Sequence, residues 1–431
     1  MNGYKINNLS SNSKRLAGNF FSLSVLQGMN YLFPIITAPY VIRVLGFPKY
    51  GLWATASVLL TYFQMFTDYG FNLSATKDIS VNRHDPKKVS DVFSAVMTIK
   101  AGLFFISILL MVAVIYSIPL FRVDHLFYMV TFSGLLGNVL FPIWYFQGIE
   151  RMKYITYLNL ASRAVVFILL FVVIKEEGDY IKFAALNSAA AILMGGVSLW
   201  IVWKYFRVRY ALPTIASLKE NLTEGWHIFV STFSINIYMN TNVLILKLVA
   251  NDTAVGYYYV AERCVMALRS LASVIFQAIY PYVCARAEES SDQFRRFFQR
   301  VGPPIFGLFF IAGTALFAFS GQVVYFFTGE FVNESITALR ILSFVPLIVA
   351  VNIPAYQTLL AYGLKKSYTT VLISGSVLNI LLNLWLAPRF YGNGTALSVL
   401  LTETYITLGL YLIIEMKHRK HSLLRTAGES S

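Results

Sequence analysis

Charged residues are scarce in this chain, and their scarcity sets its class. Asp, Glu, Lys and Arg make up 13% of the 431 residues, whereas soluble domains carry about 25%. The apolar residues form repeated blocks of roughly twenty or more, the length at which an α-helix crosses the hydrocarbon core of a bilayer. A soluble globular domain is therefore excluded, and the sequence predicts an all-α polytopic membrane protein.

Cysteines and the motifs of known enzymes are also few or missing. The two cysteines, Cys264 and Cys284, lie about 30 Å apart along one predicted helix, so they cannot form a disulfide with each other. The five histidines are scattered, and the sequence has no H-E-x-x-H, no P-loop and no serine elbow. No connection is long enough to fold as a catalytic domain. We therefore expect a protein that is not an enzyme and that binds no cofactor or metal.

The apolar blocks predict twelve transmembrane helices joined by short connections. These helices span residues 18–45, 50–72, 91–117, 124–147, 153–174, 181–204, 224–249, 254–283, 301–321, 335–362, 367–388 and 394–416. The connection between the sixth and seventh helices divides them into two groups of six. Residues 1–210 are therefore expected to form an N-terminal lobe and residues 211–431 a C-terminal lobe.

The basic residues predict the orientation of these helices. They gather in the even-numbered connections, and the odd-numbered ones hold few: Lys49, Arg122, Lys175, Lys182 and Arg389. Because cytoplasmic connections are enriched in Lys and Arg, both termini are expected in the cytoplasm. The net charge of +14 is then expected to face anionic lipid and not nucleic acid.

The first predicted helix has no charge between Arg15 and Arg43. Pro34 and Pro39 remove two backbone donors inside it, which predicts a kink or an unwound turn. In lipid such a break must face other protein or a water-filled cavity. This helix is therefore either a moving wall beside a solute path or a kinked structural helix.

A repeat relates the two halves of the chain. Arg43 corresponds to Lys247, and Gly51 to Gly256, when IRVLGFPKYG is aligned with LKLVANDTAVG. A second match relates GIERMKY to GLKKSY in the same membrane orientation. Internal repeats of six helices are typical of transporters, whose substrate site lies near mid-depth between the repeats.

Basic residues also lie inside the predicted spans, where a cation costs at least about 2.5–3.5 kcal/mol unless it finds a partner or water. Arg43, Lys247 and Arg340 lie near span ends, so their side chains can reach the headgroups. Arg43 and Lys247 are also candidates for binding an anionic substrate. The deeper and stronger candidates are Lys100, Arg163, Arg263 and Arg269.

The eighth predicted helix carries much of this buried charge. Glu262 and Arg269 are seven residues apart, so they share a face and can line one cavity, and Arg263 adjoins Glu262. A single pair of opposite charges would be structural. An excess of arginine over acid leaves positive charge for an anion, and the guanidinium fork donates two parallel hydrogen bonds to a phosphate.

Acidic residues inside the spans are fewer. Asp68 lies about a turn from the inner end of the second span, and Glu403 lies near the middle of the twelfth. Each can take up a proton or a sodium ion during transport, or can instead pair with a buried arginine. The candidates for ion coupling or gating are Asp68, Glu262, Glu403, Pro34 and Pro39.

Four segments carry a family resemblance: QGMNYLFPIITAPYVIRVLG, YGLW, FTDYGFNLSATKDIS and WYFQGIERMKYITYLNLASR. They resemble the Wzx-type O-antigen flippases, in the polysaccharide-transporter branch of the MATE-like multidrug/oligosaccharidyl-lipid/polysaccharide (MOP) superfamily. The resemblance implies twelve helices in two six-helix lobes around a central cavity. It also implies that undecaprenyl-diphosphate-linked oligosaccharide crosses the bacterial inner membrane, with membrane lipid and other polysaccharide-assembly membrane proteins as partners.

The related lipid II flippase resembles this chain at particular positions. Its eighth helix has an acidic–arginine pair that YYVAER resembles, which implies that Glu262 and Arg263 line the cavity. Asp68 matches an acid near the end of its second helix. Arginines in its first two helices fall here on uncharged residues such as Gln27 and Phe33, so the set of cations is rearranged.

The hypothesis from sequence is alternating access, in which a diphosphate–sugar head enters a cationic, wet cavity while the polyprenyl tail stays in lipid. One alternative is a MATE-like ion-coupled antiporter of small molecules, which should show net acid in its spans because it binds cations. Another is a membrane polysaccharide polymerase or ligase, which would need a large outer connection with catalytic charges. A scaffold without transport activity would gain nothing from deep arginines.

Overall fold

The computed structural model describes residues 3–417, with side chains throughout except at 3–17, 19–21, 23–24, 27, 30–31, 231, 234–239, 273, 277–278 and 291–292. Over this range the chain is helical and has no strand, as predicted. It divides into two compact units. The N-terminal unit holds the chain up to Thr37 and Ala56–Asn236, and the C-terminal unit holds Ala38–Thr55 and the chain from Ile237 on. The lobe boundary after residue 210 stays a prediction.

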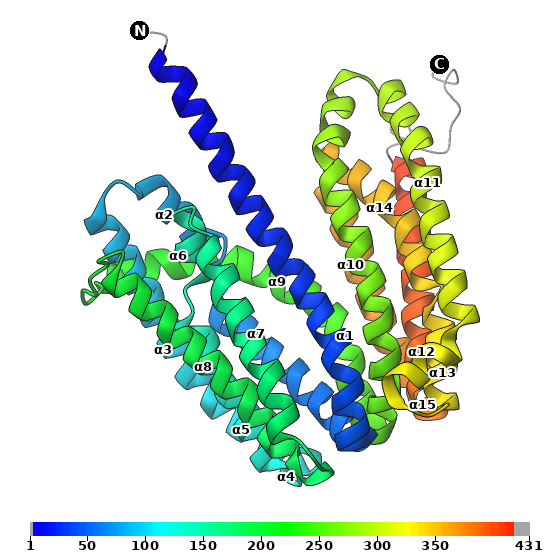
Figure 1. Ribbon diagram of the computed structural model, residues 1–431. Coiled ribbons are helices and arrows are strands. Elements are labelled where there is room, and N and C mark those ends of the chain that lie inside the picture. Colours follow the sequence, from blue (N-terminus) through cyan, green and yellow to red (C-terminus); the bar gives the residue numbers. More distant parts are fainter. Residues whose placement is uncertain (1–2, 418–431) are drawn as a thin grey trace. The chain divides into compact units, whose positions relative to one another are not determined.

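The N-terminal unit consists of helices and short connections (Figure 1). Its elements are the two outer parts of α1 (Gly3–Asp68), α2 (Ser74–Asn82), α3 (Pro86–Ser117), α4 (Pro119–Arg122), α5 (His125–Leu140), α6 (Ile143–Gly148), α7 (Lys153–Val173), the 3-10 turn Glu177–Asp179, α8 (Tyr180–Lys204) and the first part of α9 (Ile215–Val249). Small residues bring α5 and α8 together, because a Cβ on Gly195 would lie 2.5 Å from the carbonyl oxygen of Gly137. Such contacts are common between membrane helices.

The C-terminal unit is built in the same way. It contains the central part of α1, the last part of α9, α10 (Asp252–Glu289), α11 (Ser291–Ala318), α12 (Ser320–Thr328), α13 (Asn333–Leu342), α14 (Val345–Ala361) and α15 (Lys365–Lys417). Its buried apolar side chains form clusters between α14 and α15, around Leu359 and Leu410, and between α10, α11 and α14, around Phe276 and Phe309. These clusters fix α10 and α15, which carry most of the charged candidates of this unit.

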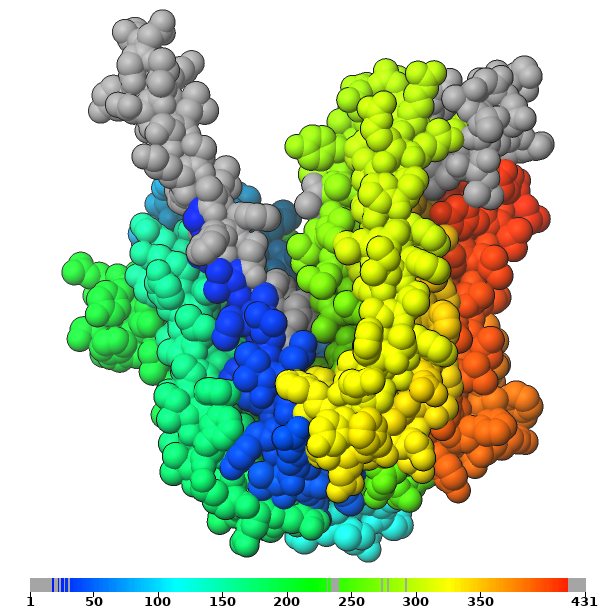
Figure 2. Space-filling view, turned by 45° about the vertical axis from the view of Figure 1, so that its right-hand side comes forward, coloured from blue at the N-terminus to red at the C-terminus, as the bar shows by residue number. Residues whose placement is uncertain are grey.

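Seven segments of the described chain are long and apolar enough to cross a membrane, and an eighth is added if the bent pair Asp252–Phe276 and Ile279–Glu289 forms one span. The seven are Pro86–Ser117, His125–Gly148, Lys153–Val173, Glu177–Lys204, Gln293–Ala318, Asn333–Ala361 and Lys365–Lys417. α11, drawn yellow-green and yellow in Figure 2, leaves Leu308, Phe310 and Ile311 exposed. Exposed apolar faces on long helices are what lipid requires, so this is a multi-pass membrane protein, and twelve spans stay a prediction.

The break inside α1 lies at Gly46 and not at the prolines. α1 has 66 residues, and Gly46 alone has non-helical torsions within it (φ 74°, ψ 168°), which fits the end of the first predicted span. Pro34 and Pro39 lie in helical backbone, so the prediction of an unwound turn there is wrong. Glycine accepts positive φ at little cost, which is why the helix opens at Gly46. The chain passes from the N-terminal to the C-terminal unit after Thr37, between the two prolines.

α15 is also interrupted where the sequence predicts a connection. Its 53 residues would extend about 80 Å as one straight helix, far more than a bilayer core. Tyr391 has the non-helical torsions φ 50° and ψ −129°. The break falls between the eleventh and twelfth predicted spans.

The two segments related by the internal repeat pack against each other within the C-terminal unit. A Cβ on Gly51 would overlap the carbonyl oxygen of Asp252 and lie 2.7 Å from the backbone nitrogen of Gly256. A Cβ on Gly256 would overlap the carbonyl oxygen of Phe47. The contact is reciprocal, because Phe47 precedes Gly51 by one helical turn, as Asp252 precedes Gly256.

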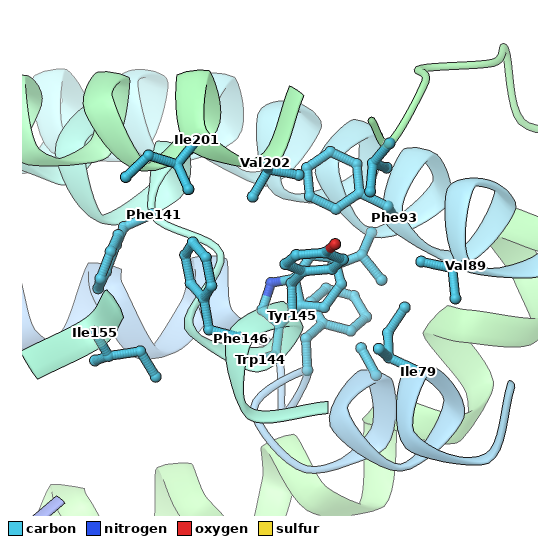
Figure 3. Close-up of a cluster of buried hydrophobic side chains, with 14 of the residues drawn as sticks. Ile79, Val89, Phe93, Phe141, Trp144, Tyr145, Phe146, Ile155, Ile201 and Val202 are labelled. Atoms are coloured by element: carbon cyan, nitrogen blue, oxygen red, sulfur yellow. The ribbon is translucent and has the colours of Figure 1, made fainter. Parts of the chain in front are cut away.

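An aromatic cluster forms a core of the N-terminal unit (Figure 3). The short helix α6 inserts Trp144, Tyr145 and Phe146 between α2, α3 and α8, and all three side chains are buried. The ring of Phe93 on α3 lies 5.5 Å from that of Trp144. This packing fixes α3, the helix that carries Lys100.

Candidate functional site

Lys100 is almost completely buried in the N-terminal unit, with 1% of the residue exposed. Its Nζ atom donates to Oδ1 of Asp68 at 2.8 Å and to the carbonyl oxygen of Asn138 at 3.4 Å. The side-chain amide of Asn72 donates to the other Asp68 oxygen at 3.4 Å. The sequence left two alternatives for Asp68, ion uptake or pairing with a buried arginine. In the structure Asp68 is paired, but its partner is a lysine. A buried pair of this kind carries no net charge.

Arg269 of α10 pairs with Glu403 of α15 in the C-terminal unit. Its Nη2 atom donates to Oε1 of Glu403 at 2.6 Å, and the two side chains are 17% and 4% exposed. The pair lies in the apolar part of two long helices, where each charge alone would be costly. Glu403 is thus paired with a buried arginine, which is one of the two roles predicted for it.

Glu262 and Arg269 line one small cavity of the C-terminal unit, as their spacing predicts. The cavity has a volume of about 20 Å³, enough for one water molecule. The hydroxyl of Tyr258 donates to Oε1 of Glu262 at 3.0 Å. Asn242 and Asn379 complete the polar part of the lining, so one carboxylate, one guanidinium and two amides face the same space.

The asparagines of this region were not predicted as site residues. Asn383 donates to Oδ1 of Asn242 at 2.5 Å, and Asn379 donates to Oγ1 of Thr402 at 3.3 Å. All four side chains are buried. Their spacing in the sequence could have identified them. Asn379 and Asn383 lie one helical turn apart in an apolar span, and polar groups at that depth need a partner or a function.

Arg263 is the candidate whose charge is least compensated. Its guanidinium carbon lies 4.3 Å from the centre of the Tyr259 ring, which in turn lies 5.5 Å from the ring of Tyr50. No ion pair within the described range includes Arg263. A cation–π contact stabilises the guanidinium by about 0.5–2 kcal/mol but leaves its positive charge in place.

Arg163 has its own contact in the N-terminal unit. Its guanidinium carbon lies 5.2 Å from the ring centre of Phe33, and this ring makes an edge contact with Phe167 at 6.4 Å. The side chain is half-buried. Arg163 and Lys100 both belong to the N-terminal unit, with separate contacts.

The counterparts Arg43 and Lys247 both hold helix ends. Arg43 is exposed and donates to the carbonyl oxygen of Phe326 at 2.6 Å, in the last turn of α12, where the helix dipole favours a cation. Lys247 is buried and donates to both carboxylate oxygens of Asp252 at 2.6 Å. These contacts account for both residues structurally.

Lys100, Asp68 and Arg163 belong to the N-terminal unit, and the other charged candidates belong to the C-terminal unit. Lys100, Lys247 and Arg269 each have a carboxylate partner, so the surplus of positive charge is smaller than the sequence predicts. Among the candidates on α10, Glu262 and Arg269 share a cavity, and Arg263 keeps its charge beside an aromatic ring. The part each residue plays in binding stays a prediction.

A helical chain with several apolar spans and ion pairs buried inside them defines a multi-pass membrane protein. The chain belongs to the polysaccharide biosynthesis protein family, whose sequence pattern matches residues 16–285. This match, with the relatives described below, confirms the predicted resemblance to O-antigen transporters.

Two curated relatives extend over nearly the whole chain. A protein of Escherichia coli strain K12 named "Putative O-antigen transporter" is 28% identical over 407 residues, which cover 93% of this chain and 96% of the relative. A protein of the same name from Shigella dysenteriae is 25% identical over 395 residues, which cover 90% and 98%.

Solved structures share the fold. The lipid II flippase MurJ in an inward closed conformation has a TM-score of 0.70 at 14% identity, over 94% of this chain and 88% of the other. An inward-facing multidrug resistance MATE family transporter of the MOP superfamily has a TM-score of 0.69 at 14% identity, over 95% and 99%. Likeness at this identity concerns the fold alone.

Proposed function

We propose that this protein moves undecaprenyl-diphosphate-linked O-antigen, or similar oligosaccharide repeat units, across the bacterial inner membrane. The family match and the names of the two relatives support a polysaccharide transporter. The shared fold with a lipid II flippase supports a lipid-linked substrate. In this proposal the protein is not an enzyme, and it works beside other membrane proteins of polysaccharide assembly.

The single observation that carries the proposal is the uncompensated charge of Arg263. A cation inside a membrane helix costs several kcal/mol, about 2.5–3.5 even on the lenient scale, and it persists only where it has water or a ligand. Glu403 pairs with Arg269, and Glu262 accepts a hydrogen bond from Tyr258 but forms no ion pair with Arg263 in the described chain. An anionic head group is the ligand that this arrangement fits, and a diphosphate suits the guanidinium fork.

Alternating access supplies the mechanism of the proposal, with twelve helices and both termini in the cytoplasm. The head group is exposed first to one side of the membrane and then to the other, while the polyprenyl tail stays in lipid. In this proposal the first helix flexes between Pro34 and Pro39 during transport, where the chain changes from one unit to the other. The residues proposed to neutralise the diphosphate during the cycle are those of the sequence hypothesis: Arg263, Arg269, Lys100 and Arg163, with Arg43 and Lys247 nearer the span ends.

Substrate binding would separate the buried ion pairs, and this links the proposed mechanism to a coupling ion. When the diphosphate takes Arg269, Glu403 loses the partner that it has at 2.6 Å, and a buried carboxylate left alone is strongly unfavourable. A proton or a sodium ion removes that penalty. The same argument applies to Asp68 when Lys100 leaves it. H⁺ or Na⁺ is therefore the coupling ion that the pairs favour.

A MATE-like antiporter of small cations is the alternative, because the two solved folds match equally well, with TM-scores of 0.69 and 0.70. A cation carrier needs carboxylates that are free to bind its substrate. Asp68, Asp252 and Glu403 are each paired with a base in the described chain, and of the candidate acids Glu262 alone accepts only from a tyrosine hydroxyl there, so the acids favour an anionic substrate except at Glu262. A polymerase or ligase finds no support in the relatives, which are named as transporters.

The test is the sidedness of labelled lipid-linked oligosaccharide in proteoliposomes that contain the purified protein. We expect the wild type to move label to the opposite leaflet faster than protein-free vesicles do, and to leave a trapped cationic dye in place. Efflux of the dye without movement of the glycolipid would replace the proposal with the antiporter. Movement of neither would remove both functions.

A further inference from the structure

A second cavity of the C-terminal unit lies among three helix connections. Its volume is about 350 Å³, within the range of about 300–1,000 Å³ that is typical of ligand sites. Its walls come from the α9–α10 connection with the first turns of α10, from the start of α13, and from the break inside α15. We call it the outer cavity. It shares only Tyr258 with the small charged cavity around Glu262 and Arg269.

The outer cavity combines aromatic rings with hydrogen-bonding groups. The side chains that matter are Tyr257, Phe390, Tyr391, Asn251, Asn393 and Glu334. Aromatic faces are electron-rich and attract the C–H groups on the face of a sugar ring, while amides and carboxylates bind hydroxyls. No Lys or Arg is among the described lining residues, so nothing there would hold a diphosphate.

Two of these rings are not needed for packing. Phe390 and Tyr391 remain 55% and 56% exposed, and an exposed aromatic pair beside polar groups is typical of a binding surface. Rings of an interfacial aromatic belt would also be exposed, but these two line a cavity. The backbone of Tyr391, with φ 50°, costs about 1–3 kcal/mol for a residue other than glycine. Such backbone strain is common where a residue forms part of a binding site.

Contacts with α10 fix the wall of the outer cavity. Asn393 belongs to this wall, but its Oδ1 atom is buried beneath the surface, so a ligand in the cavity does not reach that atom. The neighbouring Gly392 fixes this wall against α10, because a Cβ there would lie only 3.1 Å from Cβ of Tyr258. Asn251, another lining residue, caps α10 by accepting from the backbone nitrogen of Ala254 at 2.9 Å. The cavity is therefore preformed.

We propose that the outer cavity binds sugar rings of the transported oligosaccharide. The inference rests on the proposed function and adds a contact for the glycan to those for the diphosphate. All three connections are odd-numbered, so the charge distribution that predicts cytoplasmic termini also predicts that the cavity opens to the outside. A lipid tail fits it poorly, because Asn393 and Glu334 would be covered by hydrocarbon without hydrogen bonds.

The test is direct binding of sugar by the full-length protein in detergent, with no transport step. The probe is the host cell's own repeat-unit oligosaccharide, released from its lipid by mild acid and followed by saturation-transfer NMR. Phe390→Ala and Tyr391→Gly each remove one ring, and glycine also accepts the positive φ at 391, so folding is retained. Phe331→Ala is the matched control, because Phe331 is 64% exposed in the same unit and does not line the cavity.

We expect the wild type and Phe331→Ala to bind alike, and each ring variant to bind about fivefold more weakly or worse. Added pyrophosphate should not compete. No binding by the wild type, equal binding by all four proteins, or competition by pyrophosphate would overturn the inference. Ring-dependent binding by a wild type that fails to move the glycolipid would instead leave the sugar site standing and count against the proposed function.

Discussion

Replacing Glu403 with alanine is expected to destabilise the protein by about 3–5 kcal/mol, the cost of leaving one member of a buried ion pair alone. Its partner Arg269 donates to it at 2.6 Å, and the Glu403 side chain is 4% exposed. Without the carboxylate, the guanidinium stays in the apolar span with its charge uncompensated. The measurement is the midpoint of thermal unfolding in detergent.

The second half of this experiment replaces both charges. In the double variant Arg269→Met with Glu403→Met, most of the lost stability should return, because well-packed apolar residues often replace a buried pair at little cost. Translocation should stay low, since the anion-binding guanidinium is gone. The control is Glu289→Ala, which breaks the pair with Arg286 whose side chains are 45% and 47% exposed and should cost less than about 1 kcal/mol. Equal shifts in Glu403→Ala and Glu289→Ala would contradict the account of the buried pair.

Replacing Gly51 with alanine is expected to prevent folding or to lower the yield of folded protein severely. Its added Cβ would overlap the carbonyl oxygen of Asp252 and lie 2.7 Å from the backbone nitrogen of Gly256. Both obstacles are backbone atoms, so no side-chain rotation relieves them. Gly256→Ala should have a similar effect, because its Cβ would overlap the carbonyl oxygen of Phe47.

The matched control for this prediction is Gly307→Ala on α11. A Cβ at Gly307 meets no atom within 4 Å, and alanine is the better helix former by about 1 kcal/mol, so this variant should be neutral or slightly more stable. The readout is the monodisperse fraction in size-exclusion chromatography. If Gly51→Ala and Gly307→Ala give the same fraction, the reciprocal glycine contact does not hold the repeat segments together.

Helix positions were largely predictable from the sequence because they depend on local composition. The breaks at Gly46 and Tyr391 fall where the sequence has connections between apolar blocks. The break at Phe141 and Pro142 inside the fourth predicted span was not predicted, because an apolar block continues through it. At Pro34 and Pro39 the sequence predicted a break that the structure does not have. The missing backbone hydrogen bonds did not open the helix.

Pairing between helices could not be predicted. The spacing of Glu262 and Arg269 on one helix fixed their shared face, and the structure has them at one cavity. Lys100 and Asp68 lie on different helices, as do Arg269 and Glu403. Their approach depends on helix depth and rotation, which are set by packing across the whole unit. For the same reason the sequence did not predict that Ala38–Thr55 packs with the second half of the chain.

The most direct test of the central claim is the initial rate of glycolipid translocation by Arg263→Gln in proteoliposomes, beside Arg263→Lys and the exposed control Arg296→Gln. Hydrogen bonds to charged groups contribute about 1.5–3 kcal/mol. We therefore predict at least a roughly tenfold loss for the glutamine variant, partial activity for lysine and wild-type activity for the control, all at similar thermal stability. Wild-type rates in Arg263→Gln would contradict the claim that this arginine receives the anionic head.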